Sequence, residues 1–400
     1  MKNDNPANYA YKFRLYPNKS QQQLINKTFG CVRYVYNKLL ADNKKQYEET
    51  GKSKTKSYAY FKKDDEWLNE VDSMALSNAQ QNVKTAYKNF FRELKKGNVA
   101  FPKFKSKKDR HQSYTTNKST TRNNIYIEGK YIRLPKLGLI KMVKHREVEG
   151  IIKSVTISWT PSGKYYASIA VHRDDLIRPL PKTNSHVGID VGKKEYETLS
   201  TGETVGVPNF LVKADKKIAK LQRELSRKQK GSNNFEKCRI KLAKAYEHKT
   251  NCMNHFLHNQ TKKLVTEHDV IAVERLNISQ SKHSMIQQDN GMTRKEKRHA
   301  NHNTLNMSWY EWRRQLTYKA LWYEKILVVA DSNYASSQIC HKCGYKNKVT
   351  KDLQVRSYHC PKCGHHHDRD LNAAINLINL YENKDIKNMS LKDCVNLDIE

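Results

Sequence analysis

The 400-residue sequence lacks any hydrophobic run close to the roughly 20 residues that a membrane-spanning helix needs. Its first residues also lack the apolar stretch of a secretory signal peptide. Cysteine is scarce, and the chain has only 8 of them. Four stand singly along the chain, which excludes the dense disulfide framework of a small secreted protein; they are Cys31, Cys238, Cys252 and Cys394. We therefore expect a cytoplasmic protein.

The sequence also has few acidic residues relative to basic ones. The chain has 40 Asp and Glu against 74 Lys and Arg, so its formal net charge is +34. Cations in such excess repel one another unless a polyanion neutralises them. Nucleic acid is therefore the expected partner. The alternative is a generally basic protein without a polyanionic partner.

Hydrophobic periodicity divides the amino-terminal part into a strand and two helices. Residues 9–16 alternate as a strand does, and Ser20 with Gln23 is expected to form the capping box of an amphipathic helix. A second helix is expected over residues 77–96. Residues 101–110 interleave aromatic and cationic side chains, a pattern that suits stacking and phosphate contacts on RNA or DNA.

The periodicity changes to two between about residues 124 and 171, with glycine and proline at the turns. This pattern predicts a small antiparallel barrel or sheet. Residues 178–181, Arg-Pro-Leu-Pro, are a predicted linker.

Beyond that linker the pattern becomes that of an α/β domain. The polar and basic residues 277–303 show no periodicity, so we expect a mobile segment there and consider it a candidate lid. The predicted elements are strands within 186–199, at 270–274 and at 326–330, a helical hairpin over 210–268 that breaks at 230–234, an aromatic-rich helix over 306–323, and a final helix from Leu371.

Two Cys-x-x-Cys pairs lie in the last quarter of the chain, and they are formed by Cys340, Cys343, Cys360 and Cys363. The alternative function of such a pair is redox chemistry. Two pairs at this spacing favour a structural zinc site, because four thiolates complete a closed tetrahedral shell. We expect His341 and the run 365–367 to lie on the surface or to contact nucleic acid.

Three carboxylates are expected where the chain should be buried. Asp190 and Glu274 lie on hydrophobic strands, and Asp370 begins the final helix. Unpaired buried carboxylates are costly, so a shared divalent metal site is predicted, with Mg²⁺ or Mn²⁺ favoured by the oxygen ligands. Simpler roles remain open: Asp190 as a turn residue, Asp370 as a helix cap, and Asp368 as the ligand in place of Asp370. Asp331 is interpreted as a turn former.

These residues occur in motifs that resemble the RuvC-like nuclease of TnpB (OrfB) proteins, transposon-encoded RNA-guided endonucleases related to type V CRISPR effectors. The resemblance covers nearly the whole chain, and the order of the motifs is more specific than any one of them. They are Gly188–Gly192, Thr198–Gly202, Val273–Asn277, Ser336–Gly344 and Asp368–Ala374, together with Tyr11–Pro17, Cys31–Asn37 and Phe101–Ser106 nearer the amino terminus.

The resemblance implies a multidomain α/β protein with an RNase H-like (RuvC) nuclease domain. Asp190, Glu274 and Asp370 would be the catalytic triad, Asp370 being preferred over Asp368 because it immediately precedes the x-Asn-Ala-Ala stretch. Expected cofactors are structural zinc, catalytic Mg²⁺ or Mn²⁺, and a guide RNA from the transposon end. The expected substrate is double-stranded DNA, cut beside a short adjacent motif, and the expected location is the prokaryotic nucleoid.

The implied domains are a β-barrel wedge domain, a helical recognition domain inserted in it, the nuclease domain, and a zinc-ribbon insertion that binds target nucleic acid. Their expected bounds are 1–19 with 116–180 (wedge), 20–115 (recognition), 181–335 with 365–400 (nuclease) and 336–364 (zinc ribbon).

Three other functions compete with this one. Some relatives have lost catalytic residues and act as RNA-guided repressors, but all three acids are present here. A self-sufficient transposase would use a tyrosine with His-x-His, and that spacing occurs only within the run 365–367. A zinc-containing RNA-binding protein would leave the buried acids unexplained. Residues 195–197 are larger or more polar than the family's usual ones, which leaves the triad untouched.

Overall fold

The computed structural model describes residues 8–52, 54–97, 99, 101–109, 111–275, 293, 296, 304–331, 333–352, 355–382 and 397–399. The chain forms two compact units, Met1–Asp174 with Arg239–Lys244 and Asp175–Cys238 with Ala245–Glu400. The predicted mobile segment 277–303 lies outside the described residues except for Thr293 and Glu296. Within the described ranges, no helix is long and apolar enough to cross a membrane.

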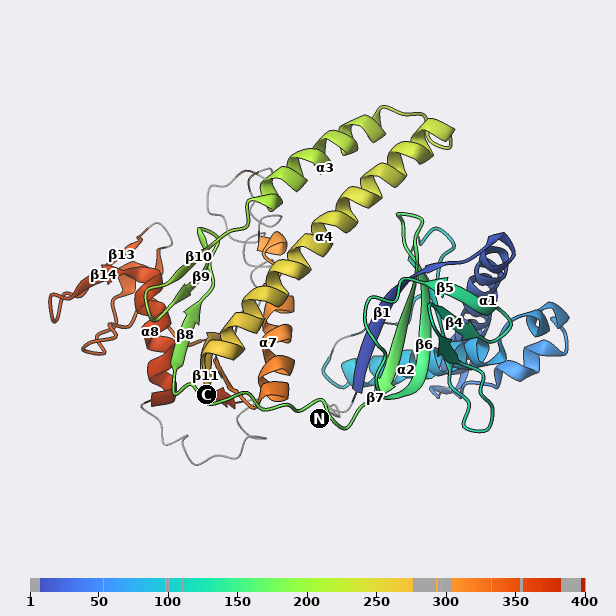
Figure 1. The fold of residues 1–400 in the computed structure, drawn as a ribbon, viewed down its shortest axis with the longest axis horizontal. Helices are drawn as coiled ribbons and strands as arrows, with labels where there is room; N and C mark the ends of the chain where they lie inside the picture. The colour runs from blue at the N-terminus through green and yellow to red at the C-terminus, as the bar shows by residue number, and fades with distance from the viewer. Residues whose placement is uncertain are drawn as a thin grey trace. The chain divides into compact units, whose positions relative to one another are not determined.

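A seven-stranded antiparallel sheet in the order β2-β6-β7-β1-β5-β4-β3 forms the core of the first unit (Figure 1). This confirms the predicted change to strand periodicity, although β2 was not predicted. The strands are β1 (Asn8–Tyr16), β2 (Gln112–Asn117), β3 (Tyr126–Glu128), β4 (Tyr131–Leu134), β5 (Gly138–Met142), β6 (Ile151–Trp159) and β7 (Tyr165–His172). The first strand lies inside the sheet, since it pairs with β7 and with β5.

Helices α1 (Lys19–Thr50) and α2 (Ser73–Leu94) pack in the same hydrophobic core, with the short 3₁₀ helices η1 (Tyr58–Lys62) and η2 (Glu66–Glu70) between them. The predicted capping box is wrong by two residues. Asn18 is the N-cap and Gln21 its partner. The reason is a tertiary contact: the Gln21 amide donates hydrogen bonds to the carbonyls of Leu137 (3.1 Å) and Leu139 (2.8 Å).

The second unit is built on a mixed sheet in the order β10-β9-β8-β11-β12-β15. Strands β8, β11, β12 and β15 are parallel, while β9 and β10 are antiparallel to their neighbours. The bounds are β8 (His186–Asp190), β9 (Glu195–Leu199), β10 (Thr204–Gly206), β11 (Val270–Glu274), β12 (Ile326–Ala330) and β15 (Leu397–Ile399). The runs at 270–274 and 326–330 are strands, as predicted, and the structure shows that they pair with each other.

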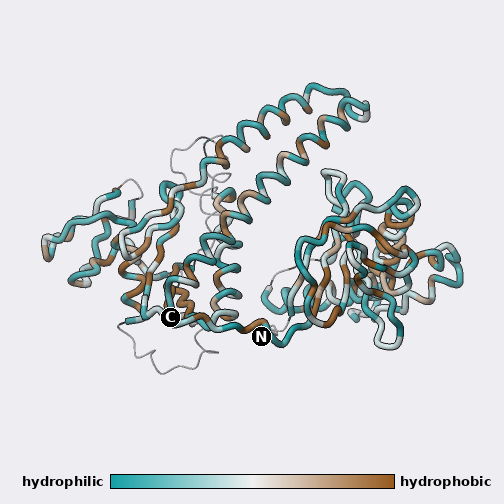
Figure 2. The backbone as a smooth tube through the Cα atoms, viewed as in Figure 1, coloured by the Kyte–Doolittle hydropathy of each residue, from teal (hydrophilic) through white to brown (hydrophobic). Residues whose placement is uncertain are grey.

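Helices cover both faces of this sheet, as Figure 1 shows. On one face, Ile271 and Val273 pack with α3 (Phe210–Ser226), α4 (Asn233–Glu267) and α7 (Trp309–Tyr323). On the other, Val270 and Ala272 pack with α8 (Arg369–Glu382). This alternation follows from the two-residue period of a strand. The apolar strands stand out as brown segments between hydrophilic stretches in Figure 2.

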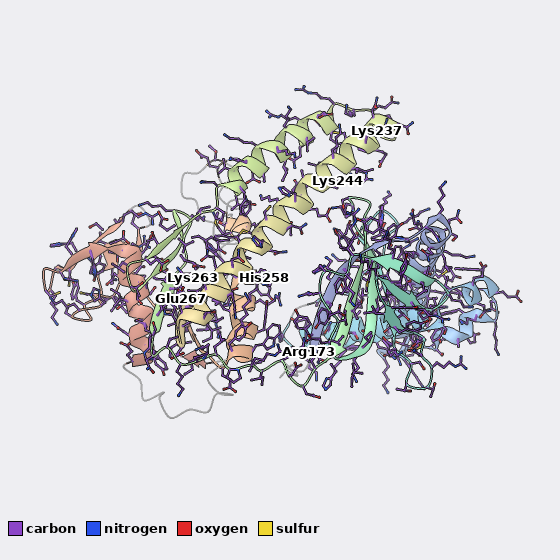
Figure 3. All side chains as sticks on the ribbon, viewed as in Figure 1. Arg173, Lys237, Lys244, His258, Lys263 and Glu267 are labelled. Atoms are coloured by element: carbon purple, nitrogen blue, oxygen red, sulfur yellow. The ribbon has the colours of Figure 1, made fainter. Side chains whose placement is uncertain are left out.

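Helices α3 and α4 form the predicted helical hairpin. Exposed lysines lie along the part of α4 nearest the hairpin turn, where Figure 3 labels Lys237 and Lys244. At the opposite end of α4, Lys263 is instead paired with Glu203 (2.5 Å) and with Glu267 (3.9 Å). The hairpin therefore has exposed lysines on the part of α4 near the turn and an ion-paired lysine, Lys263, at the opposite end.

Strand β9 carries a fully buried carboxylate. Glu197 is 0% exposed, and its Oε1 accepts a hydrogen bond of 2.6 Å from Trp312 Nε1 on α7. Its Oε2 is buried and has no hydrogen-bond partner within the described part of the chain. Burial raises the pKa of Glu197 to about 7, against the opposing effect of the indole hydrogen bond. The neutral acid therefore suits this position better than the carboxylate.

Candidate functional site

Asp190 and Glu274 end two neighbouring parallel strands and project to the same face of the sheet. Val273 lies opposite Ile189 in the ladder between β11 and β8. The next residues along the two strands, Glu274 and Asp190, are therefore also neighbours. Ile189 and Val273 both pack toward α4 and α7. Because side chains alternate along a strand, Asp190 and Glu274 point to the opposite face, the one that α8 covers.

Helix α8 approaches β8 so closely that only glycine fits between them. A Cβ on Gly188 would lie 1.9 Å from the carbonyl oxygen of Ala374 and 2.9 Å from the amide nitrogen of Ile378. Asp370 lies one helical turn before Ala374, and Asp190 lies two residues after Gly188 on the same face. This close contact therefore brings the first turn of α8 to the strand ends that carry Asp190 and Glu274.

The structure separates the two competing aspartates at the start of α8. Asp368 Oδ1 accepts hydrogen bonds from the backbone amides of Asp370 (2.8 Å) and Leu371 (3.1 Å). Asp368 is thus the residue that caps the helix. Asp370 makes no such cap, and its Oδ2 instead lies 3.4 Å from Arg356 Nη1. Helix capping therefore does not explain why an aspartate occupies position 370.

Each of the three acids has a raised pKa, and burial is the largest cause in every case. Burial, followed by the charges of Asp370 and Glu274, raises the pKa of Asp190 to about 8. Burial also raises the pKa of Glu274, and it raises that of Asp370 against the opposing charge of Arg356. A divalent cation among these oxygens would reverse the shifts, because it stabilises the ionised forms. The donor set is therefore one that fits Mg²⁺ or Mn²⁺.

Asp331 also follows a buried strand, yet it does not share this site. Its neighbours Val328 and Ala330 face α8, so the alternation directs Asp331 to the other face. Its Oδ1 accepts the amide of Asn333 at 2.8 Å, and its carbonyl accepts that of Tyr334 at 3.1 Å. This confirms the interpretation of Asp331 as a turn former.

The four predicted zinc ligands converge in a small ribbon that precedes α8. The sulfurs of Cys340 and Cys363 are 3.8 Å apart and those of Cys343 and Cys360 are 3.5 Å apart. A tetrahedron with Zn–S bonds of about 2.3 Å has edges of about 3.8 Å, whereas a disulfide would need about 2.05 Å. The sulfur positions therefore match a zinc tetrahedron and exclude disulfides within the cluster.

The backbone of the ribbon repeats itself around the two cysteine pairs. The carbonyls of Cys340 and Cys360 each accept a bond of 2.9 Å, from the amides of Gly344 and Gly364. Both glycines have positive φ, 73° and 68°, a conformation that other residues rarely adopt. Strands β13 (Ser357–His359) and β14 (His366–Asp368) close the ribbon and lead directly into α8.

Three features of this region were not predicted from the sequence. Gly188 is needed for the contact with α8, and its signal was its place in the Gly-Ile-Asp-Val-Gly motif. Arg356, which neighbours Asp370, belongs to no recognisable pattern. Three of the histidines expected on the surface, His341, His365 and His367, are half-buried and lie together, while His366 is exposed as expected.

Comparison with known proteins agrees with these features. Residues 167–285 match the OrfB_IS605 family, described as "Probable transposase", residues 7–52 match its helix-turn-helix domain, and residues 309–377 match the Cas12f1-like TNB domain. The last of these ranges contains the cysteine cluster and the start of α8.

Curated relatives resemble the chain over nearly its whole length. It is 34% identical over 389 residues to a "Putative RNA-guided DNA endonuclease" of Streptomyces pristinaespiralis, an alignment that spans 92% of this chain and 88% of the relative. It is 32% identical over 379 residues to the "Putative RNA-guided DNA endonuclease InsQ" of Escherichia coli (strain K12), with 92% and 91% covered. A mimivirus relative, "TnpB-like protein L79", is 24% identical over 402 residues.

The fold also has a solved counterpart. The chain superimposes on Cas12f1 from a cryo-EM structure of the Cas12f1-sgRNA-target DNA complex with a TM-score of 0.54, covering 92% of this chain and 98% of that one at 12% sequence identity. At this identity the likeness concerns the fold, while the curated relatives establish the kinship. The chain belongs to the OrfB_IS605 (TnpB) family of RNA-guided DNA endonucleases.

Proposed function

We propose that this RNA-guided endonuclease cleaves DNA with Asp190, Glu274 and Asp370 as the ligands of its catalytic metal ions. The proposal is supported by the positions of Asp190 and Glu274 at neighbouring strand ends and of Asp370 on the helix that packs against Gly188. Burial raises the pKa of all three acids, and the charges of Asp370 and Glu274 raise that of Asp190 further. Asp370 also has a cationic neighbour, since its Oδ2 lies 3.4 Å from Arg356 Nη1.

Each residue of the site would have its own role. Asp190 and Glu274 are held by the parallel ladder, which fixes their separation, and Asp370 is held by the contact of α8 at Gly188. Two divalent ions bound there would supply an activated water and neutralise the leaving oxygen of a phosphodiester. Arg356, beside Asp370, would contact the phosphate backbone of the strand that is cut.

The sheet of the second unit supports the RNase H-like assignment, since parallel strands with helices on both faces carry the acids at their carboxyl ends. For the first unit we propose the wedge domain at 1–19 with 116–180 and the recognition domain at 20–115. Strand β2 begins before that boundary, at Gln112. Guide RNA from the transposon end and the target duplex would be held by shape and charge, with base pairing supplying sequence specificity.

Part of the aromatic and basic segment is available for such contacts. Phe104 is 55% exposed, whereas Phe101 stacks on Phe90 with the ring centroids 4.4 Å apart. The backbone of Lys105 is fixed to α1 by two hydrogen bonds with the Asn37 amide, of 2.8 and 2.9 Å. We therefore infer that Phe104 is the stacking residue and that Phe101 anchors the segment.

The test is Mg²⁺-dependent cleavage of plasmid DNA by the full chain with its co-purified RNA. Asp190→Ala should abolish cleavage while RNA still co-purifies, because the acid contacts metal and not the guide. Asp331→Asn is the matched control: it also changes an acid after a buried strand, and it should cleave normally. Full cleavage by Asp190→Ala would contradict the assignment. A wild-type chain that binds RNA and target without cleaving would favour the nuclease-silent repressor.

A further inference from the structure

The ribbon contains a second group of metal-ligand side chains beside its four cysteines. One nitrogen each from His341, His365 and His367 lies within 4.8 Å of the others. Their ring centroids are 4.3 to 5.0 Å apart. The cysteines complete a tetrahedral shell without them, so the zinc site does not explain why three imidazoles gather here.

The strand period explains how the three meet. His366 and His367 begin β14, so His365 and His367 share one side of the chain and His366 lies on the other. His366 is exposed, and its Nε2 is hydrogen-bonded to Ser357 Oγ at 2.5 Å. His341 comes from the first cysteine turn and completes the group from across the ribbon. Three consecutive histidines therefore have two different environments.

A hydrogen-bond network around Asn372 sets the tautomer of His341. The Asn372 amide nitrogen donates to the carbonyl of Ile339 at 2.7 Å, so its Oδ1 is the atom that faces His341. That oxygen accepts the backbone amide of His341 at 3.1 Å and lies 3.2 Å from its Nδ1. Since Oδ1 can only accept, Nδ1 carries the proton and Nε2 keeps its lone pair. Metal-binding histidines are commonly oriented by such an acceptor.

A second nitrogen of the group is buried and unsatisfied. His367 Nε2 is inaccessible to solvent and has no hydrogen-bond partner among the described residues. A buried nitrogen in this state normally has a partner, because leaving it unpaired is costly. A metal ion is a partner that would also explain the neighbouring imidazoles.

We propose that His341, His365 and His367 form a second metal site for a divalent transition ion of the zinc, cobalt or nickel class. Three imidazoles suit these ions, and they leave a fourth position for water. The ion would join the first cysteine turn to β14. Through Asn372, which belongs to the first turn of α8, it would also stiffen the start of the helix that carries Asp370.

The test compares two variants of the full-length chain in an Asp190→Ala background, which removes one carboxylate ligand from the nuclease site. His365→Gln with His367→Gln removes two of the proposed ligands and keeps polar side chains, while His366→Gln is the matched control. After incubation with Zn²⁺ and gel filtration, zinc per chain is measured by elemental analysis. The control should retain one equivalent more than the double variant. Equal zinc in the two proteins would overturn the proposal.

Cobalt spectroscopy tests whether the ribbon is correctly folded in both variants. Cobalt in the four-cysteine site gives a near-ultraviolet thiolate charge-transfer band, which should be equal in both variants. Cobalt at the three histidines should add visible bands without thiolate charge transfer, and only in the His366→Gln protein. If the thiolate band is equal and these additional bands are absent from both, the histidines form a stacked cluster and the proposal is wrong.

Discussion

Replacing Gly188 with alanine should displace α8 from β8 and thereby disable the nuclease site without altering any acid. The added Cβ would lie 1.9 Å from the Ala374 carbonyl oxygen and 2.9 Å from the Ile378 amide nitrogen. Both atoms belong to the backbone, so no change of rotamer relieves the clash. Ordinary contacts of this kind need about 3.5 Å, which requires the helix to retreat by on the order of 1.5 Å.

Two magnitudes follow from that displacement. Overpacking of this kind costs about 1–3 kcal/mol, which is a fall of a few degrees in melting temperature for a unit of this size. A displacement of about 1 Å at a reacting group can lower the rate by about 100-fold. Since Asp370 lies on α8, Gly188→Ala should lose far more cleavage activity than stability.

The assay measures plasmid cleavage with Mg²⁺, melting temperature and the amount of co-purified RNA for the same preparations. Gly206→Ala is the matched control on the same sheet, because its Cβ would meet only Glu195 Oε2 at an ordinary 3.7 Å. The reasoning is refuted if Gly188→Ala cleaves at the wild-type rate and melts at the wild-type temperature. Loss of RNA binding would also refute it, since the predicted defect is confined to the cleavage site.

Three further predictions concern other parts of the second unit. The pKa of Glu197 is raised from 4.5 to about 7 in the folded protein, so this group ionises at lower pH in the unfolded chain. The free energy of unfolding should therefore fall by at most about 3 kcal/mol as pH rises from about 4.5 to about 7, and it should level off at higher pH. Glu197→Gln should therefore melt several degrees above wild type at pH 8 and equal to it near pH 4.5; a constant difference at both pH values would contradict this origin. Cys360→Ser should contain one equivalent of zinc less than wild type in elemental analysis and should lose cleavage, because the ribbon leads into α8. An unchanged zinc content would contradict the four-thiolate shell. Asp368→Asn should keep both stability and cleavage, since asparagine caps a helix as well as aspartate does, whereas Asp368→Ala should cost about 1 kcal/mol in thermal unfolding. Asp370→Asn should abolish cleavage. Loss of cleavage in Asp368→Asn would instead identify Asp368 as a metal ligand.

Local periodicity was sufficient to predict the buried strands and the helical hairpin. The runs at 270–273 and 326–330 are apolar without interruption, as strands covered on both faces are. The hairpin at 210–268 has helical spacing on both sides of a glycine-containing break. In each case the deciding information lies within one element, which is why the sequence was enough.

Features decided by distant contacts were not predictable in this way. Asn18 with Gln21 and Ser20 with Gln23 fit the capping pattern equally well, and the choice depends on carbonyls near residue 138. Strand β2 has few apolar residues, and its pairing with β6 makes it a strand. The meeting of the three histidines required the fold of the ribbon, although the two-residue period already distinguished His366 from its neighbours.

The order of the acids along the chain has a consequence for biosynthesis. Strands β8, β11 and β12 come from segments separated by long helices, and Asp370 follows all of them. During translation the first unit can fold while the second is still incomplete. A nascent chain would therefore acquire its cleavage site last, after Asp370 has left the ribosome. Any product that ends before α8 would keep the amino-terminal sheet and would lack Asp370, one of the three metal ligands that we propose.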